Sequence, residues 1–443
     1  MEPCTPTGQY YSSSSLSVCI LAVLEWDVPV DDDSQIMSLI QDVFLPINPR
    51  FASILVTGKS GEKNLKKVAV KLEDHIKVPV FEEGLSVECY DEYFQEYLSE
   101  IAMERLNKSR PLWEIHIFKY PTSNGAATTV FKLHHALGDG YSLMGALFSC
   151  LQRADNPSLS LTFPSIRSNN YMNKKKSVLE LLSVFKNTVT DFTWSLFKSN
   201  VLEDHVSPIR SGKEGVKFSP VSISTVTFSL DQTVNDVIVG IIFYGIRLYM
   251  EGTNQGSGNA RSTALVLLNT REATVYQSLE EMEKPETKGP WGENFGYIHV
   301  SIPEATNIDT SDPLEFVFEA KRMITKKKNS LVVYLTGTLI ELMRKLREIS
   351  KHIRGVIWKT SLAISNLIGP VEKMSLAKYS LKGLYFMVVN IPQSLMVMIA
   401  SYMGKLRITI GSEKELINQK LFNTCMENAF ERIYKASTKT IST

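Results

Sequence analysis

The sequence contains few cysteines, and their distribution argues against two kinds of stabilising scaffold. Only five of its 443 residues are cysteine, and no two of them form a Cys-x-x-Cys pair. An odd number at wide spacing is not typical of a disulfide framework or of a structural zinc site. The first 29 residues also lack the basic start of a secretory signal peptide. A reducing compartment is therefore the expected environment.

The chain has no excess of charge of either sign. Lys and Arg number 48 against 47 Asp and Glu, which gives a net charge of +1. No attraction of the whole chain to nucleic acid is expected, and an electrostatic partner would have to bind a local patch. With 44% hydrophobic and 21% charged residues, the composition is that of a folded globular protein. The length predicts two or three domains, or two similar lobes.

One stretch, residues 383–403, lacks any charge and is long enough to span a bilayer. Asn390, Pro392 and Gln393 lie at its middle, where a spanning helix tolerates them least. Two buried strands that are broken at these residues are therefore favoured over a membrane span. The following segment, 404–411, is the expected hairpin partner, with a turn near its first residues.

Hydrophobic periodicity divides the chain into two lobes and a connector. Residues 1–153 form an N-terminal lobe, 154–218 a turn-rich connector and 219–443 a C-terminal lobe. No internal repeat is visible. We predict strands at 17–26, 128–137, 221–230 and 262–271, and helices at 33–45, 85–106, 140–154 and 233–250.

Within the connector, a helix is predicted at 177–198, directly after three consecutive lysines. Its apolar residues recur near one face: Leu181, Phe185, Val189, Phe192 and Leu196. Two interpretations remain open. An amphipathic helix after a basic cluster can lie on an anionic membrane surface, or the same face can pack on the protein.

A second basic segment, residues 321–359, holds eleven Lys or Arg against two Glu. Most such runs are solvated helix faces. The alternatives are contact with an anionic membrane surface or with the phosphates of a cofactor.

The segment "FKLHHALGDG" places His134, His135 and Asp139 inside an otherwise apolar run. Adjacent residues of a strand point to opposite faces, so only one histidine can face a given cavity, and the other is more naturally structural. A neutral imidazole is the best side-chain base for a hydroxyl proton near pH 7. Asp139 could orient that imidazole or fix the loop, while Gly138 and Gly140 permit a tight turn.

Other chemistries fit this segment less well. The divergence of adjacent histidines and the absence of an HExxH spacing argue against a metal site. A pair of satisfied core histidines is a further alternative. The sequence has no GxSxG elbow, no phosphate-binding GxxxxGK[ST] loop and no cysteine beside these histidines. Direct transfer with a histidine base is therefore favoured over covalent catalysis.

His134 to Gly140 resembles the HHxxxDG motif of the coenzyme A-dependent acyltransferase superfamily. Other segments resemble blocks of its bifunctional wax ester synthase/diacylglycerol acyltransferases, especially the plant branch. They are EPCTPTGQ at 2–9, RPLWEIHI at 110–117, TVNDVIVG at 233–240, WGENFGYIHVSIP at 291–303 and SNLIGP at 365–370. The resemblance extends in order over nearly the whole chain.

The resemblance implies an α/β (α+β) fold of two chloramphenicol acetyltransferase-like lobes with mixed sheets and a tunnel between them. By position in the motif, His135 is the expected general base. It would deprotonate a long-chain alcohol or diacylglycerol for attack on the thioester of acyl-CoA, the co-substrate. His134 and Asp139 would hold the loop and the imidazole, and Gly140 would give room for a substrate chain. No metal or bound cofactor is expected.

Further residues receive roles by the same resemblance. The oxyanion that forms at the thioester needs hydrogen-bond donors, for which Ser365 and Asn366 are candidates, with a simple turn at Gly369 as the alternative. Trp113 would line the acyl or alcohol channel or lie in the core. Structural support is expected from Pro111, Leu112, Glu114, Asn235 and Asp236, of which Asn235-Asp236 lie near a helix start.

The resemblance has local departures, and alternative functions remain. Thr270 interrupts an expected Asn-Leu-Arg block, and the final predicted strand lacks an acidic end, but neither touches the motif. The alternatives are a transferase of the BAHD type that acts on a small soluble alcohol or amine, and a non-catalytic lipid-binding relative. The missing DFGWG block counts against the first. The expected location is the cytosolic face of the endoplasmic reticulum membrane, or else the plasma membrane.

Overall fold

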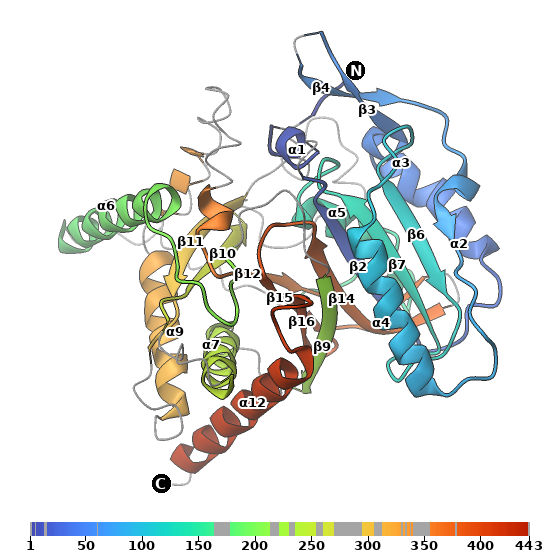
Figure 1. Cartoon of the computed structure of the whole chain (residues 1–443). Coiled ribbons are helices and arrows are strands. Elements are labelled where there is room, and N and C mark those ends of the chain that lie inside the picture. The colour runs from blue at the N-terminus through green and yellow to red at the C-terminus, as the bar shows by residue number, and fades with distance from the viewer. Residues whose placement is uncertain are drawn as a thin grey trace.

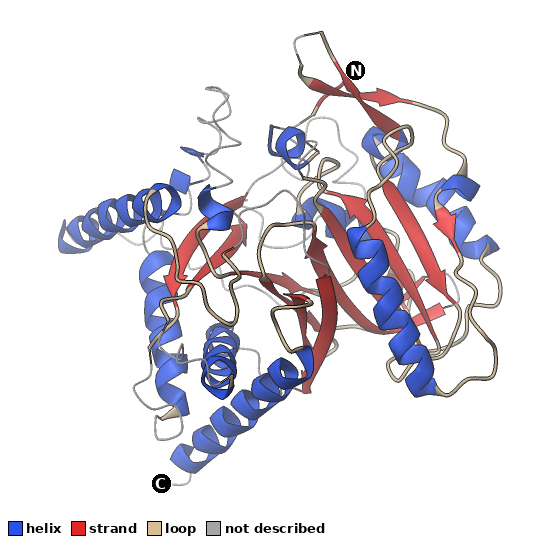
Figure 2. Ribbon diagram, viewed as in Figure 1, coloured by secondary structure: helices blue, strands red, loops and turns tan. Residues whose placement is uncertain are grey.

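The computed structural model is shown in Figures 1 and 2. The statements below concern the residues that it describes. These are 2–4, 6–12, 16–59, 61–163, 178–212, 221–229, 235–253, 260–269, 295–304, 312–328, 331–332, 335–336, 338–339, 355–376 and 379–441.

The first lobe is built on a seven-stranded mixed sheet in the order β5-β6-β7-β2-β14-β13-β8. β5 and β6 are parallel and the other described pairs are antiparallel. Its two central strands, β2 and β7, are buried along their whole length, since elements cover both faces. The strands are β2 (Cys19–Trp26), β5 (Ile76–Lys77), β6 (Trp113–Phe118), β7 (Ala127–His134), β8 (Gln152–Arg153), β13 (Met374–Leu376) and β14 (Tyr379–Val389).

Helices and a small second sheet surround this sheet. α4 begins after Ser86, whose hydroxyl accepts a hydrogen bond from the Cys89 N–H at 3.3 Å and so caps the helix. α2 (Ser34–Leu39), a π-helical turn (Ile40–Phe44) and α3 (Leu45–Ile47) form one continuous helical segment, as predicted. The remaining elements are β1 (Glu2–Pro3), α1 (Pro6–Tyr11), 3₁₀ turns at Pro49–Ala52 and Leu72–Asp74, β3 (Ser53–Thr57), β4 (Lys63–Lys67), α4 (Val87–Met103) and α5 (Gly140–Ser149).

The second lobe holds a six-stranded mixed sheet in the order β11-β10-β12-β15-β16-β9. β12 is parallel to both β10 and β15, and the other described pairs are antiparallel. α7, α9 and α12 pack against one face of this sheet (Figure 1). The elements are β9 (Val221–Ser229), α7 (Asn235–Gly252), β10 (Thr263–Asn269), β11 (Phe295–Ser301), α9 (Pro313–Lys328), β12 (Leu362–Ile368), β15 (Leu395–Tyr402), β16 (Lys405–Glu413) and α12 (Gln419–Ile441).

The uncharged stretch at 383–403 forms strands, as favoured by its sequence. β14 ends at Val389 in the first sheet, and β15 begins at Leu395 in the second. β15 and β16 form a hairpin whose turn residues, Met403 and Gly404, have φ angles of 50° and 70°. Positive φ at both turn residues matches the right-handed twist of the strands that they join. No helix in the described part of the chain is long and apolar enough to cross a membrane.

Two strands of the predicted C-terminal lobe belong to the first sheet, which chain order does not reveal. β13 and β14 belong to the predicted C-terminal lobe, yet they complete the first sheet, where β14 pairs with β2 along eight residues of that strand. The core of the first lobe also includes Ala363, Leu367 and Met398 from strands of the second sheet. The predicted boundaries at 153 and 219 therefore describe the order of the chain. In space, β13 and β14 of the C-terminal part belong to the first lobe.

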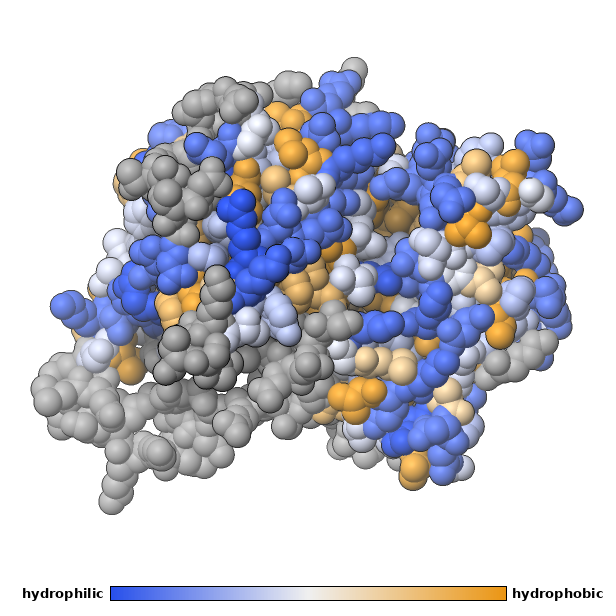
Figure 3. Space-filling model, turned by 90° about the horizontal axis from the view of Figure 1, so that it is seen from below, coloured by the Kyte–Doolittle hydropathy of each residue, from blue (hydrophilic) through white to orange (hydrophobic). Residues whose placement is uncertain are grey.

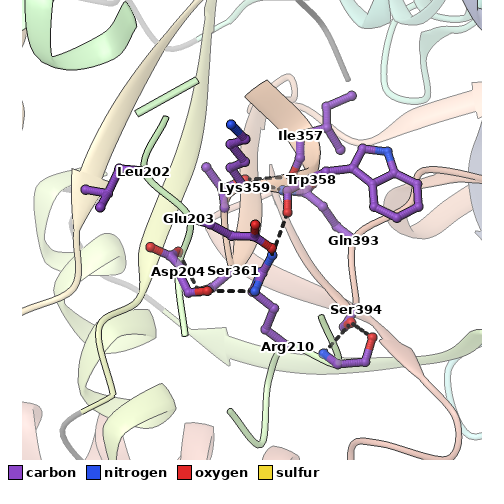
Figure 4. Close-up of polar contacts among 12 residues, drawn as sticks. Leu202, Glu203, Asp204, Arg210, Ile357, Trp358, Lys359, Ser361, Gln393 and Ser394 are labelled. Carbon is purple, nitrogen blue, oxygen red and sulfur yellow. Dashed lines mark hydrogen bonds and ion pairs between the residues drawn. The ribbon is translucent and has the colours of Figure 1, made fainter. Parts of the chain in front are cut away.

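A buried polar network ties the connector to the second lobe, and Figure 4 shows the part of it around Asp204, Arg210 and Ser361. The Lys198 ammonium and the Asp204 carboxylate, both without exposed surface, lie 2.6 Å apart. Asp204 also accepts hydrogen bonds from the Thr263 N–H and the Ser361 hydroxyl, each at 2.7 Å. The Arg210 guanidinium donates to the Asp204 carbonyl at 2.7 Å. These contacts fix the end of the connector helix to the starts of β10 and β12.

The connector helix α6 (Val178–Asn200) forms where the sequence predicts it, but a polar face points inward. Its buried side chains include Thr188, Asp191 and Ser195. Asp191 pairs with Lys327 of α9 at 3.4 Å, and the Ser195 hydroxyl lies 3.1 Å from the His299 ring. Polar contacts therefore hold much of this helix on the second lobe.

Part of the apolar stripe of α6 faces outward. Within this stripe, Phe192 packs on the core of the second lobe, whereas Phe185 and Val189 are exposed by 69% and 50%. Phe197, which lies outside the stripe, is exposed by 45%. α6 projects at the edge of the molecule in Figure 1. On the face shown in Figure 3, by contrast, hydrophilic residues cover most of the described surface, and apolar residues form small separate patches. Exposed apolar side chains that recur along one helix typically mark a contact surface.

Candidate active site

The histidine motif forms a loop between the end of β7 and the start of α5. We call residues 134–139 the motif loop. His134 is the last residue of β7, and Asp139 is the N-cap of α5. The His134 N–H donates to the Leu112 carbonyl at 3.0 Å, and the His135 N–H donates to the Val18 carbonyl at 2.9 Å. The loop therefore begins anchored to the segments on both sides of β7.

The two histidines have different environments. His134 is buried, and its Nδ1 accepts a hydrogen bond from the Ala136 N–H at 2.9 Å. This bond requires Nδ1 to be unprotonated. Burial, together with the nearby charges of His135, Lys63 and Lys108, lowers the pKa of His134 to about 3. His134 is therefore a neutral, structural residue that stabilises the turn of the loop.

His135 is half-buried, and its ring contacts an aromatic side chain from the N-terminus. The Tyr11 ring meets the imidazole in an edge-type contact, with 4.8 Å between centroids and 64° between planes. Of the two histidines, His135 is thus the more exposed one. The expectation that one histidine faces a cavity and the other supports it stays a prediction.

Neighbouring segments hold the backbone carbonyls of the motif loop. The Cys4 thiol lies 3.9 Å from the Ala136 carbonyl oxygen. The buried Arg50 guanidinium donates to the Leu137 carbonyl at 3.3 Å. These contacts come from the first residues of the chain and from the turn after α3. They leave little freedom in the backbone that carries His135.

Asp139 acts as a helix cap in the structure. One oxygen of its buried carboxylate accepts hydrogen bonds from the Ser142 N–H at 3.0 Å and the Ser142 hydroxyl at 2.8 Å. This is a typical N-cap arrangement, which fixes the start of α5 and with it the end of the motif loop. The predicted role of Asp139 in holding the loop is therefore visible, whereas its predicted role in orienting an imidazole stays a prediction.

The two glycines of the loop differ in how closely they are surrounded. A side-chain carbon on Gly138 would lie 3.1 Å from the Ser142 Cβ, which is tight packing. On Gly140 it would meet a single described atom within contact distance, the Ile20 Cδ1 at 3.9 Å. There is space beside Gly140, as its predicted substrate-binding role requires, although that role itself stays a prediction.

The segment Pro111–Glu114 supports the motif directly. It leads into β6, and the Leu112 carbonyl receives the His134 N–H. Burial acts to raise the pKa of Glu114, but the interactions with His116, 3.6 Å away, and with the charge of Lys77 outweigh it, so this pKa is lowered. Leu112 thus contacts the motif loop through its carbonyl, and Glu114 is an ionised group paired with Lys77. The supporting roles predicted for Pro111, Leu112 and Glu114 stay predictions.

Trp113 occupies the core instead of a channel in this conformation. It has no exposed surface, its indole N–H donates to the Phe51 carbonyl at 2.8 Å, and it stacks on His75 with centroids 4.1 Å apart. A residue with no accessible surface lines no open channel. The core alternative for Trp113 therefore describes the structure, and its predicted substrate-binding role has no support from it.

Ser365 and Asn366 lie on β12, where strand alternation separates them. Ala363 and Leu367 pack into the core shared with the first lobe, and Ile364 packs into the core of the second. Ser365 is therefore on the face turned to the first lobe, and Asn366 is on the opposite, helix-covered side of the sheet. If the oxyanion forms between the lobes, Ser365 has the better position. β12 ends at Ile368, directly before Gly369, so the alternative of a turn at Gly369 stays open.

The other predicted residues lie at the limits of the described residues. α7 begins at Asn235, as the expected helix start requires, but the side chains of Asn235 and Asp236 lie outside the description. Much of the basic segment at 321–359 is also outside it. In the described part of the chain, no group of three or more His, Cys, Asp or Glu side chains could hold a metal ion.

Comparison with known proteins places this loop within a defined family. The family model for the wax ester synthase/diacylglycerol acyltransferase catalytic domain matches residues 82–196, which include the motif loop. The model for the WS/DGAT C-terminal domain matches residues 291–434. The chain belongs to the wax ester synthase/diacylglycerol acyltransferase family. It is therefore an acyltransferase, and the donor used by this family is acyl-CoA.

Relatives in Arabidopsis thaliana match the chain almost from end to end. Wax ester synthase/diacylglycerol acyltransferase 9 is 28% identical over 94% of this chain and 92% of its own length. Wax ester synthase/diacylglycerol acyltransferase 10 is 28% identical over 100% of this chain and 98% of its own length. The likeness therefore includes both lobes and the connector.

Solved structures share the fold of this family member. A wax ester synthase/diacylglycerol acyltransferase from Marinobacter aquaeolei VT8 superimposes with a TM-score of 0.63 at 15% identity, over 98% of this chain and 100% of that one. The starter condensation domain of rhizomide synthetase, solved as a single-residue mutant in complex with C8-CoA, gives a TM-score of 0.55 at 10% identity over 98% and 91%. These likenesses confirm the mixed α/β fold predicted from the sequence.

Sequence reasoning missed three residues at this site: Tyr11, Arg50 and Lys63. Tyr11 contacts the His135 ring, and Arg50 holds the loop carbonyl of Leu137. The Lys63 ammonium donates to the Ser12 carbonyl at 2.6 Å and to the Ser12 hydroxyl at 2.9 Å. The available indication was the resemblance of residues 2–9 to a block of the plant branch, which ascribed no role to individual residues.

Proposed function

We propose that this enzyme transfers a fatty acyl group from acyl-CoA to the hydroxyl of a long-chain alcohol, of diacylglycerol, or of both, with His135 as general base. The products would be a wax ester or a triacylglycerol, and CoA. The names of the Arabidopsis relatives and of the matching family model support these acceptors.

The observation that carries this proposal is the contrast between the two histidines. His134 is buried, bonded through Nδ1 and held neutral, so it is committed to structure. His135 is half-buried on a loop in which the backbone groups of four consecutive residues, 134–137, contact neighbouring segments. An accessible imidazole on a rigid support is the arrangement that general base catalysis needs.

The mechanism follows from this arrangement. The His135 imidazole accepts the proton of the acceptor hydroxyl as its oxygen attacks the thioester carbonyl. The tetrahedral oxyanion that forms is stabilised by hydrogen-bond donors, for which Ser365 faces the first lobe. When the intermediate collapses, the carbon–sulfur bond breaks and the imidazolium returns its proton to the departing thiolate. No covalent enzyme intermediate is required.

The test is CoA-thiol release from palmitoyl-CoA by the wild type and by His135→Ala, with hexadecanol and then diacylglycerol as acceptor. Loss of a general base typically reduces the rate by about 10²–10⁴-fold. We expect acceptor-dependent release in the wild type and a loss of that size in the mutant, with an unchanged circular dichroism spectrum. Chromatography of the lipid products identifies the acceptor. Near-normal turnover by a folded His135→Ala protein would disprove the assignment.

The same experiment separates the alternative functions. A transferase of the BAHD type would release CoA with soluble phenols or amines instead of the two lipid acceptors. A non-catalytic lipid-binding relative would load lipid and release no CoA with any acceptor. The first outcome is not expected, because the family model and the Arabidopsis relatives favour lipid acceptors. The second is not expected, because the motif loop presents a partly exposed imidazole.

We further propose that the enzyme works at a membrane surface, where both lipid substrates dissolve, at the cytosolic face of the endoplasmic reticulum or at the plasma membrane. The exposed Phe185, Val189 and Phe197 of α6 support surface contact. An interfacial helix buries such side chains among lipid headgroups without crossing the bilayer.

A further inference from the structure

The N-terminal segment, residues 2–12, covers the motif loop in the structure. Its helix α1 ends at Tyr11, which is 7% exposed and lies against the His135 ring with 4.8 Å between ring centroids. The Cys4 thiol of the same segment faces the Ala136 carbonyl at 3.9 Å. This segment is more than 120 residues away in sequence from the loop that it contacts.

A short chain of backbone hydrogen bonds joins Tyr11 to His135. The Val18 N–H donates to the Tyr11 carbonyl at 3.3 Å, and the Val18 carbonyl accepts the His135 N–H at 2.9 Å. The two residues are therefore linked both through their rings and through one intervening residue. The backbone bonds fix the backbone of His135 relative to Tyr11, and the ring contact acts on the imidazole itself.

Lys63 holds the N-terminal segment in this place. Its ammonium donates to the Ser12 carbonyl at 2.6 Å, to the Ser12 hydroxyl at 2.9 Å and to the Gln9 carbonyl at 3.4 Å, all at the end of α1. The Cys4 N–H donates to the Lys63 carbonyl at 2.9 Å, next to the pairing of β1 with β4. One lysine thus fastens both ends of the segment to β4.

We propose that Tyr11 is a positioning residue for the general base, and that its ring fixes the orientation of the His135 imidazole. The inference rests on the proposed role of His135. An imidazole can rotate about the bond to its ring, and rotation changes which nitrogen faces the substrate hydroxyl. A neighbouring ring at contact distance restricts that rotation. A catalytic group has to be held within about 10–20° of its productive orientation.

The proposal makes the ring of Tyr11 the essential part, since the contact is between rings. Tyr11→Phe keeps the ring and Tyr11→Leu removes it. Tyr10→Leu is the matched control, because it removes a ring of the same kind from the adjacent residue of α1, which packs partly on the core and is not the ring in contact with His135.

Steady-state kinetics with palmitoyl-CoA and hexadecanol test the proposal. Misplacement of a catalytic group by about 1 Å can cost about 100-fold in rate. We expect Tyr11→Leu to lower kcat by about 10- to 100-fold with little change in the KM for palmitoyl-CoA, on the same physical ground. Tyr11→Phe should retain most of the activity, and Tyr10→Leu should behave as the wild type.

Each contrary result has a definite meaning. Unchanged kcat in Tyr11→Leu would overturn the proposal. An equal loss in Tyr10→Leu would mean that the helix is merely structural, and an equal loss in Tyr11→Phe would mean that the hydroxyl acts instead of the ring. Either would also overturn it.

A second measurement keeps this test separate from the proposed function. Diethylpyrocarbonate modifies accessible neutral imidazoles, and peptide mass spectrometry resolves the modification at His135. We expect faster modification in Tyr11→Leu than in the wild type or Tyr10→Leu. An unchanged rate would contradict a positioning contact. If the wild type released no CoA with any acceptor, the proposed function would fail, and the modification rate would still decide how Tyr11 holds His135.

Discussion

At the scale of single residues, two adjacent histidines differ because a backbone N–H binds the ring of the first, whereas the ring of the second stays partly exposed. The turn after β7 brings the Ala136 N–H onto the His134 ring, which buries that ring and lowers its pKa to about 3. The next side chain points elsewhere and meets Tyr11. The motif predicts that two histidines lie at the site. The conformation of the turn determines that His134 is bonded to the backbone and that His135 contacts Tyr11.

The depressed pKa of His134 makes the stability of the protein depend on pH. The unfolded chain binds a proton here below its ordinary pKa of 6.5, whereas the folded protein does not until about 3. The stabilising contribution is therefore complete above pH 6.5 and is lost as the pH falls toward 3. Burial also lowers the pKa of His75 and His116, which adds to the effect in the same direction.

We expect His134→Asn to weaken this dependence, because the Asn side-chain oxygen can accept the Ala136 N–H without taking up a proton. Between pH 7.5 and 5, the wild type should lose roughly 2 kcal/mol more unfolding free energy than the variant, at about 1.4 kcal/mol per pKa unit. Urea unfolding of both proteins at the two pH values measures the difference. Parallel losses in the two proteins would show that His134 is not the titrating group.

At the scale of elements, the sequence of α6 determines that a helix forms, but not which of its faces is buried. Periodicity predicts the helix and its apolar stripe. The inward face is set by partners outside the helix: Lys327 for Asp191 and His299 for Ser195 from distant segments, and Asp204 for Lys198 from just after the helix. Buried charges need such partners, so the polar residues turn inward and part of the apolar stripe remains exposed.

The terminal helix α12 lies in residues 419–441, for which no element was predicted.

The exposed stripe of α6 leads to a prediction about membrane contact. Phe185→Glu combined with Val189→Glu should reduce sedimentation of the protein with vesicles of phosphatidylcholine and phosphatidylserine, because lipid contact would bury charges. Unfolding free energy should change by less than about 0.5 kcal/mol, since both side chains are exposed. Val80→Glu is the control, as it places the same charge on an exposed valine of the first lobe. Equal sedimentation of all three proteins would exclude α6 as the contact surface.

At the scale of the whole molecule, one buried ion pair joins the lobes. Arg407 of β16 in the second sheet pairs with Glu25 of β2 in the first, and its guanidinium also lies over the Tyr385 ring at 5.2 Å. Burial raises the pKa of Glu25, against the opposing effect of Arg407. Gly383 leaves room for the carboxylate, since a side-chain carbon there would come within 2.0 Å of a Glu25 oxygen. The pair therefore couples the lobes where β14 passes between them.

Breaking this pair from one side should be costly. Arg407→Met leaves a buried carboxylate without its cation, which typically destabilises a protein by about 3–5 kcal/mol. Adding Glu25→Gln should recover part of the loss, because no buried charge then remains. Urea unfolding of the wild type, both single variants and the double variant gives the coupling energy. Strictly additive effects would mean that the two side chains do not stabilise the contact between the lobes.

The sequence by itself determined much of this protein. Local periodicity and turn residues predict β2, β7, α4 and α6, and the strands within 383–403, since hydrogen bonding and side-chain direction within an element depend on neighbouring residues. The HHxxxDG motif predicts the site and resembles that of the coenzyme A-dependent acyltransferase superfamily, and the further blocks along the chain narrow the resemblance to the family.

The tertiary structure decided the pairings between distant segments. It places β14 in the first sheet, turns Ser365 and not Asn366 toward the first lobe, and sets Tyr11 against His135. It also puts Trp113 in the core. Such choices depend on which surfaces bury one another across hundreds of residues, and no local pattern in the sequence records that.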